Sequence, residues 1–287
     1  MTVYELVNNQ IIEAMASGSC PWRKPWQTVE AGLPVNAVSK KEYRGINLWL
    51  LGMSRFSDNR WLSFKQAQQL GGNVRRGEKA STAVFWKMLE TTTDDNGEKR
   101  EEHVPMLRYY SVFNVDQCEG LRLAPLPVFE LKDHERIEAA ESMVRKMPNR
   151  PAITESGQAA WYIPSADRVN VPALGSFDSA DAYYATLFHE LGHATGHESR
   201  LNRSELTGVV RFGSADYSRE ELVAELTSAY CCASLKLDNS LVENSAAYLK
   251  GWLRALKDDP KMIVIASARA QKAADYIRGA SWEESGE

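Results

Sequence analysis

The residues with the clearest chemical meaning lie together in the segment 188–193, which reads FHELGH. It contains the pattern H-E-x-x-H, in which His189 and His193 are four residues apart and so project from one face of a helix toward one metal ion. Glu190 lies about 100° further round that helix, where it can reach a water molecule on the metal instead of binding the metal itself. This pattern is typical of zinc metallopeptidases. The structural alternative is two core histidines beside a surface glutamate.

The chemistry expected of such a site is hydrolysis of a peptide bond. The metal lowers the pKa of its bound water toward about 7, and Glu190 takes the proton to produce the nucleophile. The metal also polarises the substrate carbonyl, and Glu190 can return the proton to the leaving amine. Tyr217 is a candidate donor to the oxyanion. We expect Zn²⁺ at this site, and Mn²⁺ or another divalent metal is also compatible.

A catalytic zinc site needs a third protein ligand and an open position for water. The metzincin pattern requires a histidine at position 199, which is Ser199, so that class is excluded. His197 follows His193 by four residues but lies beyond the expected helix end at Gly196, so we expect it either to support the metal ligands or to lie at the surface, and not to bind the metal.

The segment 217–225, YSREELVAE, offers better candidates for the third ligand. An acidic ligand followed four residues later by a second acid lets the second acid orient a ligand histidine. Glu221 and Glu225 meet this requirement, and we favour Glu221 as the ligand, with Glu225 and Glu220 as alternatives. Ser218 and Glu221 also have the spacing of a capping box, which would give Glu221 a structural role only. The combination of H-E-x-x-H with a glutamate ligand is gluzincin-like.

The elements that must position these residues can be read from capping residues and apolar spacing. A helix is expected from Ala180 to Ala194, because Asp178 or Ser179 can cap it and it contains no proline. Short strands are expected at 159–163 and 168–171, and further helices at 131–147, 218–235, 245–257 and 260–276. The sequence of the second half of the chain therefore predicts a domain with a small sheet and long helices.

The first half of the chain has a different composition. The 287 residues carry a net charge of −4, but residues 20–88 contain twelve Lys and Arg against four Asp and Glu, a charge of +8 that leaves −12 for the rest. The same segment holds five of the eight tryptophans. Cations that follow phosphates, interleaved with rings that stack on bases, are typical of a groove for single-stranded nucleic acid. The alternative for most single aromatic residues is a place in the core.

Several residues of this basic segment are candidates for DNA contact. They are Trp22, Arg23, Lys24, Trp26, Lys40, Lys41, Tyr43, Arg44, Lys65, Arg75, Arg76 and Lys79. Trp49 and Trp86 lie in apolar or strand-like runs and are expected to be buried, whereas Trp22 and Trp26, in a charged stretch with two prolines, are harder to assign to a core. Residues 73–79 are expected to form a basic turn between a helix at 63–70 and a strand at 82–86, and residues 94–97 an acidic hairpin tip before a strand at 107–115.

The remaining features concern compartment and domain division. Residues 1–17 predict an amphipathic helix and not a signal peptide, and no apolar run reaches the roughly 18 residues of a membrane span. The four cysteines show no metal-type spacing, which favours reduced thiols in a cytoplasm. Pro125 and Pro127 mark a break, so we expect an α+β chain of two domains, a basic α/β module at 1–128 and a metal-binding domain at 129–287.

With these motifs together, the chain resembles the ArdC family of plasmid-borne antirestriction proteins over nearly its whole length. The resemblance rests on residues 189–201 (HELGHATGHESRL) and 220–226 (EELVAEL), and on residues 21–26, 43–47, 61–66, 71–79 and 113–115. It implies an N-terminal single-stranded-DNA-binding domain, with Asn47 among its candidate contacts, and a C-terminal zincin-like metallopeptidase domain. It also implies a role in protecting incoming single-stranded plasmid DNA from host restriction during conjugation in the bacterial cytoplasm. A similar N-terminal domain occurs in plasmid primases.

Two other functions are compatible with the same residues. The first is a non-proteolytic single-stranded-DNA-binding protein in which the metal site is structural. The second is a DNA-activated protease that acts on DNA-bound proteins. In the leading hypothesis the partners are single-stranded DNA and a protein substrate, either a restriction enzyme or a DNA-bound protein, with no membrane involved.

Overall fold

The structure is a computed structural model that describes residues 1–17, 20–22, 33–54, 56–95, 98–124, 133–203, 215–239 and 246–280. Helices and strands are both abundant, which confirms the expected α+β class. Among the described residues, no helix is long and apolar enough to cross a membrane.

The first part of the chain builds a sheet with the strand order β1-β2-β5-β4 and two flanking short helices. Its elements are α1 (Val3–Ala16), β1 (Val35–Asn36), α2 (Ile46–Gly52), β2 (Arg60–Leu62), α3 (Phe64–Gln69), β3 (Asn73–Val74), β4 (Ser81–Asp95), β5 (Glu98–Asn114) and β6 (Cys118–Glu119). The predicted helix at 63–70 is confirmed as α3, which begins after Ser63 because the Ser63 hydroxyl accepts a hydrogen bond from the Gln66 N–H. The amphipathic helix predicted at the N-terminus is confirmed as α1.

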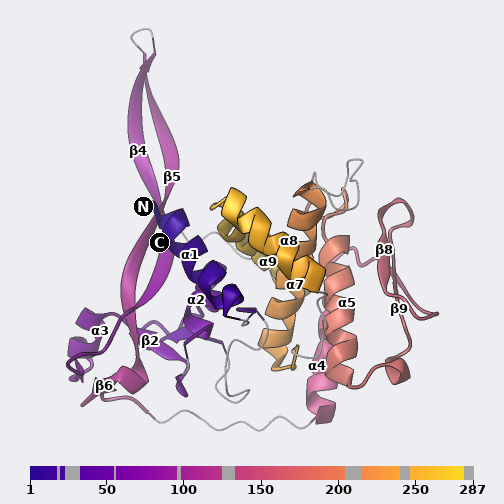
Figure 1. Cartoon of the computed structure of the whole chain (residues 1–287), viewed down its shortest axis with the longest axis horizontal. Helices are drawn as coiled ribbons and strands as arrows, with labels where there is room; N and C mark the ends of the chain where they lie inside the picture. Colours follow the sequence, from indigo (N-terminus) through magenta and orange to yellow (C-terminus); the bar gives the residue numbers. More distant parts are fainter. Residues whose placement is uncertain are drawn as a thin grey trace.

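Strands β4 and β5 form a long antiparallel hairpin that projects from the body of the protein (Figure 1). Their register runs from the pair Ser81–Val112 at the base to the pair Asp95–Glu98 at the far end. The acidic tip predicted at 94–97 falls at this far end, although residues 96 and 97 themselves lie outside the described residues.

The second part of the chain places a three-stranded sheet at one edge and packs long helices beside it (Figure 1). The elements are α4 (Asp133–Lys146), β7 (Ala152–Glu155), β8 (Trp161–Ile163), β9 (Arg168–Val171), α5 (Ala180–Ala194), α7 (Ala215–Leu235), α8 (Ala246–Asp258) and α9 (Met262–Ile277). In the sheet, β9 lies between β7, to which it is parallel, and β8, to which it is antiparallel. Helix α5 has the predicted bounds, and its cap is Ser179, whose hydroxyl accepts a hydrogen bond from the Ala182 N–H.

One hydrophobic core joins the two parts. Val7 and Ile11 of α1 belong to the same buried cluster as Phe188 of α5. Trp49 of α2 packs on Tyr230 of α7, with a distance of 4.6 Å between the ring centroids. Burial of these large side chains is the main favourable term that holds the N-terminal elements against helices α7, α8 and α9.

The tryptophans follow the sequence expectations only in part. Trp49 is fully buried, as predicted. Trp86 is expected to be buried but is 42% exposed, and it makes an edge contact with the ring of Tyr4, at 6.4 Å between centroids. Trp22 was expected to be available for stacking on bases, but it is 0% exposed and packs against Trp252 at 5.8 Å.

Candidate metal centre

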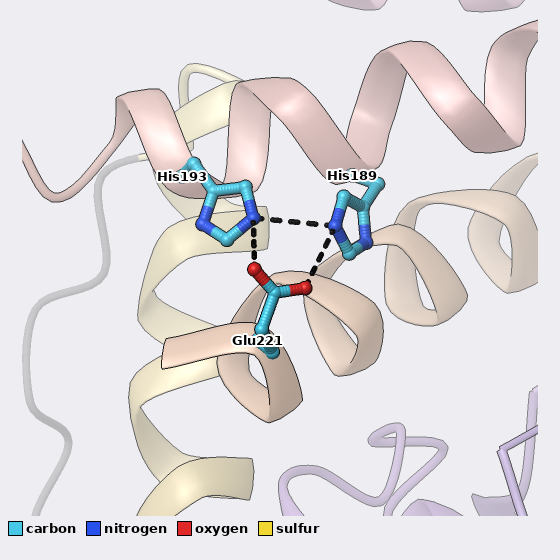
Figure 2. Close-up of side chains that lie close together, drawn as sticks. All are labelled: His189, His193 and Glu221. Carbon is cyan, nitrogen blue, oxygen red and sulfur yellow. Dashed lines mark hydrogen bonds and ion pairs between the residues drawn. The ribbon is translucent and has the colours of Figure 1, made fainter. Parts of the chain in front are cut away.

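Helix α5 turns its two histidines toward α7. The spacing of four residues places His189 and His193 one above the other on the same face, and their Nε2 atoms lie 3.2 Å apart. In Figure 2 both rings point to the carboxylate of Glu221, which comes from the neighbouring helix α7. The Glu221 oxygens lie 3.6 Å from His189 Nε2 and 3.5 Å from His193 Nε2. One ligand atom from each of the three side chains therefore lies within 4.8 Å of the others.

These distances fit the donor set of a divalent metal. In a tetrahedral site with bonds of about 2.0–2.1 Å, neighbouring donor atoms are separated by roughly 3.4 Å. The nitrogen–nitrogen and nitrogen–oxygen separations of 3.2 Å, 3.6 Å and 3.5 Å are close to that value. Two imidazoles with one carboxylate are also a ligand set that suits zinc and other first-row metals.

Two further glutamates of α7 lie on the opposite sides of the histidine rings. Glu225 Oε2 is 3.6 Å from His189 Nδ1, and Glu220 Oε1 is 3.5 Å from His193 Nδ1. A carboxylate on the outer nitrogen of a histidine fixes the ring orientation and makes the inner nitrogen more basic. The arrangement around Glu225 is the one expected from the sequence. The contact of Glu220 with His193 was not anticipated.

A buried arginine completes this arrangement and was missed by the sequence analysis. Arg203 is 7% exposed and donates from Nε and Nη2 to the two oxygens of Glu220, at 3.0 Å and 2.5 Å. It also donates to Thr195 Oγ1 at 2.7 Å and to the carbonyl of Gly192 at 2.8 Å. Arg203 therefore ties the C-terminal end of α5 to the carboxylate of α7 that lies beside His193.

The local charges shift two pKa values. Burial lowers the pKa of His189, but Glu221 and Glu225 outweigh it, and the pKa is raised well above its ordinary value. Burial raises the pKa of Glu220, but His193 and Arg203 outweigh it and lower the net pKa. The carboxylates around His189 stabilise its protonated form, and the cationic partners of Glu220 stabilise its ionised form.

Glu190 lies on α5 beside the histidines and is 8% exposed. Its carboxylate has no hydrogen-bond or ion-pair partner among the residues that the structure describes. A nearly buried carboxylate without a competing partner remains available for proton transfer.

Three other sequence expectations for this region have different outcomes. The structure does not bring His197 to the cluster, because it lies after α5 with its Nδ1 atom 2.8 Å from Ser199 Oγ. This position agrees with the alternative in which His197 lies away from the ligands, and the carboxylate beside His193 comes from Glu220. Ser218 lies inside α7, which begins at Ala215, so it is not the cap of this helix, and the capping-box alternative for Glu221 is wrong. The side chain of Tyr217 lies outside the described residues.

The close approach of α5 and α7 depends on Gly192. A Cβ atom at this position would lie 3.1 Å from Ala224 Cα and 3.2 Å from Thr227 Cβ. We therefore expect Gly192→Ala to push the helices apart by a few tenths of an ångström and to weaken metal binding roughly tenfold, the lower end of the effect of changes around metal ligands. The measurement is metal affinity by competition with a coloured chelator.

Gly251→Ala in α8 is the matched control for this prediction. Nothing lies within 4 Å of a Cβ atom built there, so the substitution adds helix propensity without a steric cost. Metal affinity should be unchanged in this control. Equal metal affinities for Gly192→Ala and the wild type would show that the spacing of α5 and α7 does not determine how tightly the site binds metal.

The residues predicted to contact DNA are spread over the surface and the interior of the N-terminal part. Those on the surface are Lys40, Lys41, Lys65, Arg75, Arg76 and Lys79. The Arg75 guanidinium is held by Glu78, at 3.0 Å, and by two backbone carbonyls. Arg23, Lys24 and Trp26 lie outside the described residues.

Four other candidates have structural partners in the interior or at the contact between the two parts. Trp22 and Tyr43 are buried, so their predicted exposure to DNA is wrong for this structure. Arg44 forms an ion pair with Asp275 of α9. Asn47 donates to the carbonyl of Val84 and accepts from its N–H, both at 2.7 Å.

The fold and the site place the second part of the chain among the zincin-like metallopeptidase domains. Residues 138–269 match the family model of the zincin-like metallopeptidase MPTase-PolyVal, and residues 1–113 match ArdcN, the N-terminal domain of the anti-restriction factor ArdC. The chain belongs to the ArdC family of antirestriction proteins, as the sequence resemblance indicated.

Solved structures agree with this assignment. The antirestriction ArdC protein of plasmid R388 is 36% identical to this chain with a TM-score of 0.77. The match to its metal-free structure covers 96% of this chain and 97% of the R388 chain. The match to its Mn(II)-bound structure covers 99% of this chain and 100% of the R388 chain.

Curated relatives extend the comparison. The uncharacterized protein y4eC of Sinorhizobium fredii is 39% identical over 286 residues, which are 96% of this chain and 91% of that protein. Two DNA primases TraC of Escherichia coli are 37% and 36% identical, each over 96% of this chain. The chain spans only 20% and 27% of the lengths of those primases.

Proposed function

We propose that this ArdC-family protein binds single-stranded DNA through its N-terminal part, residues 1–128, and acts as a metal-dependent peptidase through residues 129–287. In this role it protects incoming plasmid DNA from host restriction in the cytoplasm during conjugation. The observation that carries the proposal is the convergence of His189, His193 and Glu221 beside the carboxylate of Glu190, which has no hydrogen-bond partner among the described residues. A structural metal site has no need of a nearly buried carboxylate without a partner.

The residues at this site divide the work of peptide hydrolysis. His189, His193 and Glu221 would hold a divalent ion. Such an ion, when bound, supplies Lewis-acid chemistry that acidifies water and polarises a carbonyl. Glu190 accepts the proton of the attacking water and delivers it to the leaving amine. Tyr217 is the proposed donor to the oxyanion.

Zn²⁺ and Mn²⁺ are both candidates for the native metal. Two imidazoles and a carboxylate suit zinc. The relative from plasmid R388 has been solved with Mn(II), which supports a site of relaxed metal preference. Zinc and manganese contents of protein purified without added metal distinguish the two.

The proposal of DNA binding rests on charge and aromatic content. Residues 20–88 combine a charge of +8 with five tryptophans, and exposed cations lie on several surface segments of the N-terminal part. Two of the relatives are DNA primases that contain a region matching nearly this whole chain. A protein whose partner is an unpaired strand needs both cations for the phosphates and flat rings for the bases.

The test of DNA binding compares an unpaired oligonucleotide with the duplex of the same sequence over a range of salt concentrations. We expect stronger binding to the single strand, because only unpaired bases can stack on protein side chains. The logarithm of the affinity should fall with the logarithm of salt concentration by about 0.7 for each phosphate neutralised. Equal affinity for the duplex would contradict a stacking mode.

The same preparations can separate the proposal from its alternatives. Full protection of DNA by a Glu190→Ala variant that retains its metal would favour a non-proteolytic antirestriction protein. Cleavage of a DNA-bound protein only when single strands are added would favour a DNA-activated protease. Cleavage of a purified restriction enzyme would identify the protein substrate.

A further inference from the structure

The base of the β4–β5 hairpin carries an exposed face that combines rings and cations. Side chains alternate between the two faces of a strand, and the register pairs Phe85 with Arg108 and Lys87 with Met106. Tyr110, two residues beyond Arg108, shares their side of the hairpin. We call this surface the outer hairpin face, and it consists of Phe85, Lys87, Met106, Arg108 and Tyr110.

The opposite side of the hairpin packs on α1 and the main core, whereas the outer side is buried only at its base, where Ala83 and Val112 join a separate small cluster. Val84 and Leu107 are each 6% exposed and belong to the main core. Trp86 contacts the ring of Tyr4 in α1. Tyr109 is on this side as well, and it pairs with Val84 across the strands. The outer hairpin face therefore points away from α1 and the main core.

Apolar side chains on the outer hairpin face remain partly open to solvent. Phe85 is 39% exposed and Met106 is 37% exposed. The ring of Tyr110 lies edge-on to Phe85, with 5.7 Å between centroids, and holds it from one side. Clustered apolar surface that a protein leaves exposed, with polar residues around it, is typical of a binding site.

The charge of this surface selects the class of ligand. Lys87 and Arg108 are both exposed, and the segments 81–87 and 106–114 contain no Asp or Glu. At its base this face continues into Tyr110, which packs against the small buried cluster that contains Tyr43. An exposed ring with two neighbouring cations is complementary to a base and the phosphates that flank it.

We propose that the outer hairpin face is the platform on which single-stranded DNA binds. A base stacks on Phe85, and Arg108 and Lys87 bind the phosphates that flank it. The inference rests on the proposed single-strand binding and adds its location. The stacking ring proposed here is Phe85, which is accessible in the folded protein, and not Trp22 or Tyr43, which are buried.

The test measures the affinity of the full-length protein for a fluorescent oligo-dT by anisotropy. Phe85→Ala should weaken binding roughly ten- to hundredfold, as expected for the loss of one stacked base, and Phe85→Tyr should restore it. Arg108→Gln should reduce the slope of log affinity against log salt by about 0.7. The control is Tyr109→Ala, which removes a ring that is 57% exposed from the neighbouring position on the opposite side of the hairpin.

The possible results distinguish a failure of the proposed location of the DNA site from a failure of single-strand binding itself. Wild-type affinity in both Phe85→Ala and Arg108→Gln would overturn the location while leaving single-strand binding intact. If the wild type itself does not bind the oligonucleotide, both proposals fail. A bromouracil-substituted oligonucleotide gives a second readout that does not depend on the stability of the variants, because crosslinks to residues 81–88 or 106–111 are expected and crosslinks confined to other segments would overturn the location.

Discussion

Replacing Glu190 with glutamine is expected to lower the rate of peptide hydrolysis by a factor of about 10² to 10⁴, while the metal content stays at the wild-type level. Glutamine keeps the shape of the side chain but cannot accept a proton from water. The ligand atoms of His189, His193 and Glu221 are unchanged by the substitution. The measurement combines hydrolysis of fluorescein-labelled casein, with and without single-stranded DNA, and metal analysis of the same samples.

The control for this experiment is Glu198→Gln, which removes the same charge from an exposed position beyond the end of α5. It should hydrolyse casein at the wild-type rate. Undiminished hydrolysis by Glu190→Gln would contradict the assignment of Glu190 as the general base. Loss of metal from Glu190→Gln would instead indicate that Glu190 helps to bind the cation. No hydrolysis by the wild type under either condition would count against peptidase activity on this substrate.

The second large effect is expected at Arg203. Its guanidinium is buried with the carboxylate of Glu220, at side-chain exposures of 6% and 7%. Arg203→Ala leaves that carboxylate buried without its cation and also frees the carbonyl of Gly192 and the hydroxyl of Thr195. Removing one partner of a buried ion pair costs about 3–5 kcal/mol. We expect the melting temperature of the metal-free protein to fall by on the order of 10 °C.

Arg219→Ala is the matched control, because Arg219 forms an ion pair with Asp259 at side-chain exposures of 42% and 36%. An exposed pair contributes about 0–1 kcal/mol, so the melting temperature should change little. Similar melting temperatures for Arg203→Ala and Arg219→Ala would contradict the role of Arg203 in joining α5 to α7.

The helix that carries the two histidines could be predicted from the sequence, because its cap and its residue spacing are properties of one short segment. Helix α5 follows from Ser179 as a cap and from an uninterrupted helical pattern, and the two histidines follow from their spacing on it. The contact between Arg203 and Glu220 could not be predicted in this way. It joins residues from different elements, and its energy comes from burial in the folded protein. The sequence indicates this contact only through the presence of Arg203 shortly after the H-E-x-x-H motif.

The tryptophans show the same limit in the N-terminal part. Trp22 lies among charged residues and prolines, which suggests a surface position, yet Trp252, far away in the sequence, covers it. Trp86 lies in a strand-like run, which suggests burial, yet the hairpin extends past the elements that could cover it. Whether a ring is buried depends on tertiary neighbours and not on the composition of its own segment.

The shared core of α1, α2, α5 and α7 has a consequence for how such a chain is inherited. A boundary cut between the two family-model segments would expose Val7 and Trp49 on one side and Phe188 and Tyr230 on the other. Recombination that transfers only one half would therefore deliver a fragment with an open apolar surface. The TraC primases match 96% of this chain as a stretch within much longer proteins. The stretch that those primases share with this chain therefore spans both halves of the common core.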